Sequence, residues 1–348
     1  MQKICVTIYL RGEFDMRTGV MEQLQLRART NLQRVVFPEA SEEKMLRAVR
    51  QVRDMGIANP ILVGEPKAVS VLAGSIGISL DGITVVDSTD SGKVEQFAGG
   101  YAKINPDFPP SAVKRMLKNP LYFAAMMVKL GETDCMVAGL SHTTAEVIMA
   151  SEMIIGLQEG ISTVSSTGIL SIPGYEGPEG SLLGIADCAV CPAPDSKELA
   201  DIAISTADTL QSLLGWEPRV ALLSFSTKGS ASHELVDTVL KALEMVRERR
   251  PELLIDGELQ LDSAIVPEVA ARKVKGGSAV AGKANILIFP DLNAGNIGVK
   301  LVQRFAKAVA YGPLLQGFAK PVSDLSRGAP VEEIVGATTM VAVRAQNK

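Results

Sequence analysis

Four short apolar segments decide the fold: RVVF (34–37), PILVG (60–64), ITVVD (83–87) and DCMVAG (134–139). Segments with helical periodicity separate them. The first of these helices is predicted to begin at Ser41, a favourable N-cap residue, and to end at Gly56. Buried strands that alternate with amphipathic helices are typical of βαβ units around a parallel sheet.

One more helix is expected after the loop INPDFPP at 104–110. Its apolar face runs through Met116, Phe123, Met127 and Leu130. The strand at 134–139 follows, so the alternation of strand and helix continues past the loop.

The pattern changes after about residue 150, where apolar runs end in polar turns that contain glycine. These segments are GIADCAVCPAPD, RVALLSFSTKGSA, ELLIDGELQLDSAIVP and ANILIFPDLNAGN. Polar strand ends are where open α/β sheets bind ligands. We therefore predict two α/β lobes, one formed by residues 1–150 together with 306–348, which fold back on it, and one by residues 151–305.

Composition limits the class of function. The chain has 348 residues, 47% of them apolar, and a net charge of -4, so it lacks the basic excess that nucleic-acid binding requires. No apolar stretch reaches about 18 residues, the length of a membrane span. The brief apolar run at 4–10 is followed by charged residues and no cleavage site, which argues against a signal peptide. Four cysteines in so long a chain predict no disulfide framework, and a reducing, cytoplasmic location is expected.

The segment SFSTKGSASHELV supplies a candidate anion site. Ser226, Thr227, Lys228, Gly229 and Ser230 follow an expected strand and precede an expected helix. Hydroxyl groups, a cation and a helix N-terminus together favour a phosphate or an oxyanion. The spacing is not that of a Walker loop, and the same residues can serve only as turn and cap residues.

The segment DLSRGAPVEEI supplies a candidate catalytic turn. The Ser326 hydroxyl and the Arg327 guanidinium can stabilise an oxyanion, and the Glu333 carboxylate can accept a proton. The alternative is a capped helix with solvated acidic residues.

Other polar clusters are weaker candidates. Four polar residues alternate along one segment, so in a strand their side chains would share one face: Asp256, Glu258, Gln260 and Asp262. Such a face could bind a metal ion, or it could accept hydrogen bonds from backbone N–H groups. The CAVC segment at 188–191 has no second CxxC to complete a zinc site, and buried cysteines are expected there. His142 and His233 lie at no spacing that indicates a hydrolase triad, and no metal is expected.

Seven motifs together resemble the phosphate acetyltransferase (phosphotransacetylase) family, including its ethanolamine-utilisation branch. They are VFPEASEEKMLRA, ILVGEP, DCMVAGLSHTTAEV, LSFSTKGSA, IDGELQLDSAIVPEVAARK, GKANILIFPDLNAGNIGVKL and YGPLLQGFAKPVSDLSRG. The resemblance covers about residues 33–345 and leaves Met16 and Met21 as alternative starts. It implies two three-layer αβα lobes with a cleft between them, like isocitrate and isopropylmalate dehydrogenases, and a homodimer.

The resemblance also implies an activity: the interconversion of acetyl-CoA or another short acyl-CoA plus phosphate with acyl phosphate plus CoA. CoA is then a substrate, and no tightly bound cofactor is expected. Ser326 and Arg327 match the family's reactive pair, and Glu333 matches its base, where many relatives have Asp. The 226–230 segment and Asn296 are implied to bind substrate.

The chain departs from the family where CoA phosphates are usually bound. Family arginines match Lys44, a residue near Tyr101, and Met149, and none of these is arginine here. Lys44 keeps a charge and stays a candidate substrate-binding residue. Two other functions therefore remain open. One is a weakly catalytic acyl-CoA or acyl-phosphate sensor, like the related domain of some malic enzymes. The other is an NAD-linked dehydrogenase, although no GxGxxG follows the first expected strand.

Overall fold

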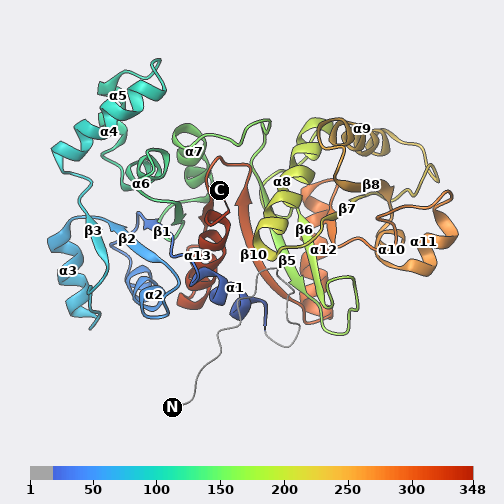
Figure 1. Cartoon of the computed structure of the whole chain (residues 1–348), viewed down its shortest axis with the longest axis horizontal. Helices are drawn as coiled ribbons and strands as arrows, with labels where there is room; N and C mark the ends of the chain where they lie inside the picture. The colour runs from blue at the N-terminus through green and yellow to red at the C-terminus, as the bar shows by residue number, and fades with distance from the viewer. Residues whose placement is uncertain (1–18, 348) are drawn as a thin grey trace, which may run out of the picture.

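The computed structural model describes residues 19–347, and their strands form two sheets (Figure 1). The predictions made for residues 4–10 and for Met16 lie outside the described residues. The first sheet is parallel throughout, in the order β11 (Val322–Asp324), β4 (Cys135–Ala138), β1 (Arg34–Phe37), β2 (Asn59–Val63) and β3 (Thr84–Val86). The four apolar segments of the N-terminal half therefore form strands, as predicted.

Helices cover both faces of this sheet because its strand residues alternate between two cores. Val35 and Phe37 point to one core, and Val36 points to the other. The first core also contains side chains of α1 (Val20–Ala28), α2 (Glu43–Asp54), α3 (Pro66–Ser75) and α13 (Val331–Ala345). The second contains those of α4 (Ser91–Ile104), α5 (Pro110–Met116), α6 (Pro120–Lys129) and α7 (Thr144–Ile154).

The single helix expected after residue 110 was wrong, since α5 ends at Met116 and α6 begins at Pro120. Proline disfavours the helical conformation for the residue before it. Asn119 accordingly has an extended backbone and caps α6 by accepting a hydrogen bond from the Leu121 N–H at 2.9 Å. The apolar periodicity continues across this break, so periodicity alone did not reveal it.

The second sheet is mixed, in the order β10 (Val309–Gln316), β5 (Ser165–Ser171), β6 (Leu182–Ala186), β9 (Ile286–Ile288), β7 (Arg219–Leu223) and β8 (Leu254–Leu259). β5 runs antiparallel to both its neighbours. α8 (Ser196–Leu214) and α9 (Glu234–Arg249) cover one face. The other is covered by α10 (Leu261–Ile265), α11 (Pro267–Lys273) and α12 (Leu292–Phe305). Each lobe thus has three αβα layers, as predicted.

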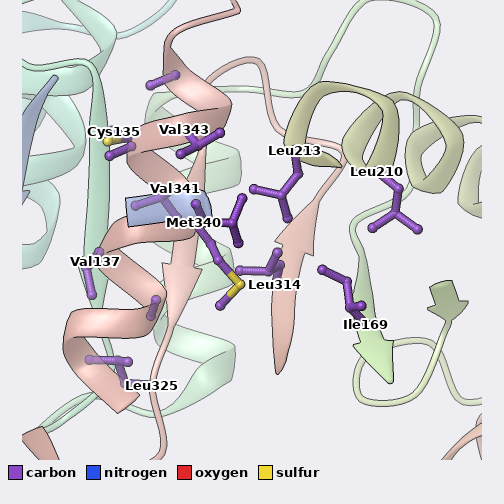
Figure 2. Close-up of a cluster of buried hydrophobic side chains, with 14 of the residues drawn as sticks. Cys135, Val137, Ile169, Leu210, Leu213, Leu314, Leu325, Met340, Val341 and Val343 are labelled. Atoms are coloured by element: carbon purple, nitrogen blue, oxygen red, sulfur yellow. The ribbon is translucent and has the colours of Figure 1, made fainter. Parts of the chain in front are cut away.

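The C-terminal segment links the two lobes. β10 lies at the edge of the second sheet, whereas β11 and α13 return to the first. Figure 2 shows Met340 of α13 extending toward Leu314 of β10, with Leu213 of α8 beyond it. All three side chains belong to one buried cluster, so the lobes share a continuous hydrophobic core. The boundaries proposed near residues 150 and 305 stay a prediction.

No helix in residues 19–347 combines the length and the apolar character that crossing a membrane requires.

Candidate active site between the lobes

The candidate site lies where three neighbouring strands of the first sheet end. β1, β4 and β11 are parallel and adjacent, so their carboxyl ends meet at one edge. Glu39 follows β1, the loop at 139–143 follows β4, and Asp324 ends β11. This edge is where open α/β sheets bind ligands.

Glu39 organises the loop after β4. Its side chain is fully buried, and its carboxylate accepts hydrogen bonds from the backbone N–H groups of residues 139–142, at 2.9 to 3.1 Å. The Ser141 hydroxyl donates to it at 3.1 Å, and His142 Nδ1 lies 2.8 Å away. Burial alone would raise the pKa of Glu39, but these hydrogen bonds hold it below its usual value.

Asp324 lies against the same loop. The Thr144 hydroxyl donates to Asp324 Oδ2, whereas Oδ1 is buried without a partner among the described residues. Gly139 has φ +121°, and a Cβ there would lie 2.5 Å from Asp324 Oδ1 and from the Leu325 N, so only glycine fits. Burial raises the pKa of Asp324 to about 6, and the charge of Glu39 acts in the same direction, against the hydrogen bonds from Thr144 and Leu325.

The turn between β11 and α13 presents the predicted catalytic groups. Ser326 and Arg327 are exposed, and the Gly328 N–H donates to Ser326 Oγ at 3.3 Å. Within residues 19–347 the Arg327 guanidinium forms no hydrogen bond or ion pair, so it is free to bind a ligand. Glu333 occupies the first turn of α13 and is exposed.

A cavity of about 370 Å³ brings these groups together. Ser326, Arg327 and Glu333 all line it, with Asp324 and with residues 142–144 of the Glu39-bound loop. Residues 312–314 of β10 form the wall contributed by the second sheet. The cavity therefore lies between the lobes, and we call it the cleft cavity.

Lys44 lies at the edge of the site. It occupies the first turn of α2, and its Nζ lies 3.5 Å from the carbonyl oxygen of Gly328, beside Arg327. The other two family arginine positions are less suited to binding an anion. Tyr101 is buried, with its hydroxyl donating to the Met153 carbonyl at 2.9 Å, and Met149 is an exposed apolar residue of α7.

The structure does not bring the 226–230 turn to the cleft cavity. None of these five residues lines it, and their polar groups bind other parts of the second lobe. Glu258 accepts hydrogen bonds from the Ser226 hydroxyl at 2.8 Å and from the Gly229 N–H at 2.7 Å. Lys228 Nζ lies 2.5 Å from Asp256 Oδ1. Substrate binding by Ser226, Thr227, Lys228, Gly229 and Ser230 stays a prediction that this geometry does not support.

The alternating polar residues at 256–262 belong to the same set of contacts as the 226–230 turn. β8 ends at Leu259 and Asp262 lies in α10, so the four side chains do not share one strand face. Asp256 and Glu258 hold the 226–230 turn in place, which matches the hydrogen-bond acceptor alternative. In the part of the chain that the structure describes, no three His, Cys, Asp or Glu side chains are placed to hold a metal ion.

A second cavity of about 240 Å³ adjoins the first, since Gly312 and Pro313 line both. Asn296 lies in its wall, and its Nδ2 donates to the Cys188 carbonyl at 3.2 Å. Cys188 and Cys191 are free and only half-buried, and burial raises the pKa of each thiol to about 12. Both thiols are therefore protonated at neutral pH.

Sequence reasoning missed Glu39 and Asp324, and it dismissed His142. Glu39 and Asp324 both lie in the quoted motifs, PEASEEK and DLSRG, but no role was assigned to them. His142 pairs with a carboxylate that is 103 positions away. The available signal was that polar residues closely follow the apolar runs at 34–37 and 134–139, both of which are predicted strands.

Comparisons with known proteins agree with this architecture. The family model for phosphate acetyl/butaryl transferase matches residues 19–342. A phosphate acetyltransferase of Acetivibrio thermocellus is 44% identical over 328 residues, which cover 94% of this chain and 98% of the relative. The EutD phosphotransacetylase structure from Staphylococcus aureus has a TM-score of 0.84 at 34% identity, over 93% of this chain and 99% of that one.

A more distant likeness concerns the fold alone. A 4-hydroxythreonine-4-phosphate dehydrogenase structure from Klebsiella pneumoniae has a TM-score of 0.53 at 9% identity, over 91% of this chain and all of the other. The expected similarity to dehydrogenase folds is therefore confirmed. The family match spans both lobes and every residue of the candidate catalytic turn, so the chain belongs to the phosphate acetyl/butaryl transferase family and is an acyltransferase.

Proposed function

We propose that this enzyme interconverts acetyl-CoA, or another short acyl-CoA, plus phosphate with acyl phosphate plus CoA. One observation carries the proposal: an unpaired guanidinium, a hydroxyl and a carboxylate, from Arg327, Ser326 and Glu333, line the same cavity between the lobes. These are the groups that a direct acyl transfer needs, namely an oxyanion site and a base. The names of the similar proteins support the same reaction.

The proposed transfer proceeds by direct thiolate attack. Glu333 accepts the proton of the CoA thiol, and the sulfur bonds to the carbonyl carbon of the acyl phosphate. The carbonyl oxygen becomes an oxyanion that Arg327 and Ser326 stabilise. As the carbonyl re-forms, the C–O bond to phosphate breaks and its electron pair leaves with the phosphate. A thiol has a pKa of about 8.5, so a carboxylate base is effective only if a cation such as Arg327 also stabilises the thiolate.

An assay of free thiol tests the function. Release of CoA from acetyl-CoA in the presence of phosphate is measured for the wild type and for Arg327→Ala. Removing the oxyanion donor should reduce turnover about 100- to 1,000-fold. A wild type that turns over no faster than Arg327→Ala would refute the transferase proposal.

A second candidate function is a weakly catalytic sensor of acyl-CoA or acyl phosphate. It rests on the positions where family members carry arginines, because Tyr101 is buried with its hydroxyl bonded and Met149 is apolar. Loss of charge-assisted contacts to the CoA phosphates weakens CoA binding. Calorimetry with acetyl-CoA separates the two: binding without turnover supports the sensor, and measurable turnover supports the enzyme.

The proposal includes a homodimer. Ile297, Leu301 and Phe305 of α12 are spaced by four residues and are at least half exposed, and Phe305 is 83% exposed. An apolar stripe of this kind is typical of a protein interface. Light scattering should show a dimer for the wild type and a monomer for Phe305→Glu.

A cytoplasmic location is also proposed. Three cysteines are free, which is the state that a reducing compartment maintains: Cys135, Cys188 and Cys191.

A further inference from the structure

The proposed reaction needs a second cation, because the phosphate that leaves or attacks carries its own charge. In the cleft cavity the permanent cation is Arg327, which the mechanism assigns to the oxyanion. The 226–230 turn does not supply another, since Lys228 and Arg247 both lie against Asp256, at 2.5 and 3.3 Å. The seat for the phosphate must therefore be sought elsewhere on the second lobe.

The 240 Å³ cavity is directly next to the site. Gly312 and Pro313 form its border with the cleft cavity, so a ligand that passes them enters both. One wall comes from β5 and β6, through Thr167 and Ile185, and the opposite wall comes from α12. Because it opens beside the acyl-transfer groups, this cavity can hold one end of an acyl phosphate.

The α12 wall carries polar side chains. Asn296, Lys300 and Gln303 lie at spacings of four and three, so they share one face of the helix, and all three line the cavity. Within residues 19–347, Lys300 forms no ion pair or hydrogen bond, in contrast to Lys228. The hydrogen bond from Asn296 Nδ2 to the Cys188 carbonyl leaves its second N–H available.

The position of α12 is fixed by close packing. A Cβ at Gly295 would lie 2.1 Å from the Asp187 carbonyl oxygen, so the helix approaches the loop after β6 as closely as only glycine allows. Asp187 in turn accepts hydrogen bonds from the backbone N–H groups of residues 189 to 191, at 2.8 to 3.2 Å. The cation of Lys300 is thus carried on a rigid wall rather than on a loose surface loop.

We propose that Lys300, with the side-chain amides of Asn296 and Gln303, seats the phosphate group of inorganic phosphate or of the acyl phosphate. This inference rests on the proposed function for its substrate. It assigns the seat to α12 in place of the 226–230 turn, and it leaves Arg327 for the oxyanion. The acyl carbon then lies between the two lobes, at Gly312 and Pro313.

Two substitutions test the seat. Lys300→Gln removes the charge and keeps a polar side chain that is one bond shorter, and Lys300→Arg keeps the charge. Lys241→Ala, in the exposed face of α9 on the same lobe, is the control. Lys300→Gln should raise the Kd for inorganic phosphate, measured by calorimetry, about 10- to 100-fold, and the KM for acetyl phosphate similarly. The KM for CoA should not change, Lys300→Arg should restore most of the affinity, and Lys241→Ala should match the wild type.

The binding measurement keeps this inference separate from the reaction. If the wild type binds phosphate through Lys300 but shows no turnover, the seat stands and the proposed function fails. Unchanged phosphate affinity in Lys300→Gln overturns the seat, whether or not the enzyme turns over, and so does a wild type that binds no phosphate. A rise in the KM for CoA alone also overturns it, because Lys300 would then contact a phosphate of CoA.

Discussion

Replacing Glu39 by Gln tests whether one buried carboxylate holds the site together. Gln has nearly the same shape but presents one acceptor oxygen and an NH2 group in place of two oxygens. If the NH2 group replaces Oε2, it faces the Leu140 N–H, which donates to Oε2 at 2.9 Å. If it replaces Oε1, it faces the N–H groups of Ser141 and His142. In the first orientation a buried N–H loses its acceptor, and in the second two half-buried N–H groups do.

The magnitude follows from these contacts. An unsatisfied buried donor costs about 1–3 kcal/mol, and the remaining hydrogen bonds weaken when the acceptor loses its charge. We expect Glu39→Gln to lower the free energy of unfolding by about 2–4 kcal/mol. The matched control is Glu43→Gln. Glu43 is exposed and pairs with Arg47 four residues along α2, so its loss should cost only about 0.3–0.5 kcal/mol.

Urea unfolding at several pH values measures both variants. The pKa of Glu39 is lowered by folding, so its contribution to stability is complete above its usual pKa of about 4.3 and is lost as the pH falls through the lower folded value. The difference between the wild type and Glu39→Gln should therefore be constant from pH 5 to 8 and shrink below pH 4. A Glu39→Gln variant as stable as Glu43→Gln would refute the role assigned to this carboxylate.

Three further substitutions address the site. Asp324→Asn should stabilise the protein by about 1–2 kcal/mol at pH 8, because burial raises the pKa of Asp324 to about 6 and so disfavours its ionised form in the fold. The gain should fall to about half at pH 5 and vanish below the usual Asp pKa of about 3.9, and equal thermal shifts at pH 8 and pH 5 would contradict this. Glu333→Gln should reduce kcat at least 100-fold with Kd for CoA unchanged, and an unaltered kcat would place the base elsewhere. Met149→Arg should lower the KM for CoA about 10-fold, and a higher KM would show that α7 does not face CoA.

Much of the first lobe could be predicted from periodicity. Val35, Val36 and Phe37 are apolar on both faces of the strand, which indicated a buried parallel strand, and they lie in two different cores. The helix boundary at Pro120 could not be read from periodicity, since a proline interrupts backbone hydrogen bonding without changing the apolar pattern. The candidate catalytic turn was predicted from its motif. Its place in a cavity depends on how elements far apart in the sequence pack together.

Contacts between distant residues explain what the sequence could not provide. Glu39 and His142 are 103 positions apart, and no spacing rule connects them. They meet because β1 and β4 are neighbours in the sheet, although β2 and β3 lie between them in the chain. Sheet order, rather than residue spacing, therefore determines which polar strand ends share a site.

The 226–230 turn and Lys300 differ in whether the protein has already paired their charge. Both offer a lysine near a helix, and the turn adds hydroxyl groups, so composition favours the turn. In the structure Glu258 and Asp256 already bind the donors of the turn, and an anion there would compete with two buried carboxylates. Lys300 has no such neighbour among its contacts in the described chain, and its cavity adjoins the cleft cavity at Gly312 and Pro313. A lysine or arginine can bind a substrate anion only where no carboxylate of the protein already neutralises it. A paired cation supports the structure, and an unpaired cation is available to a ligand.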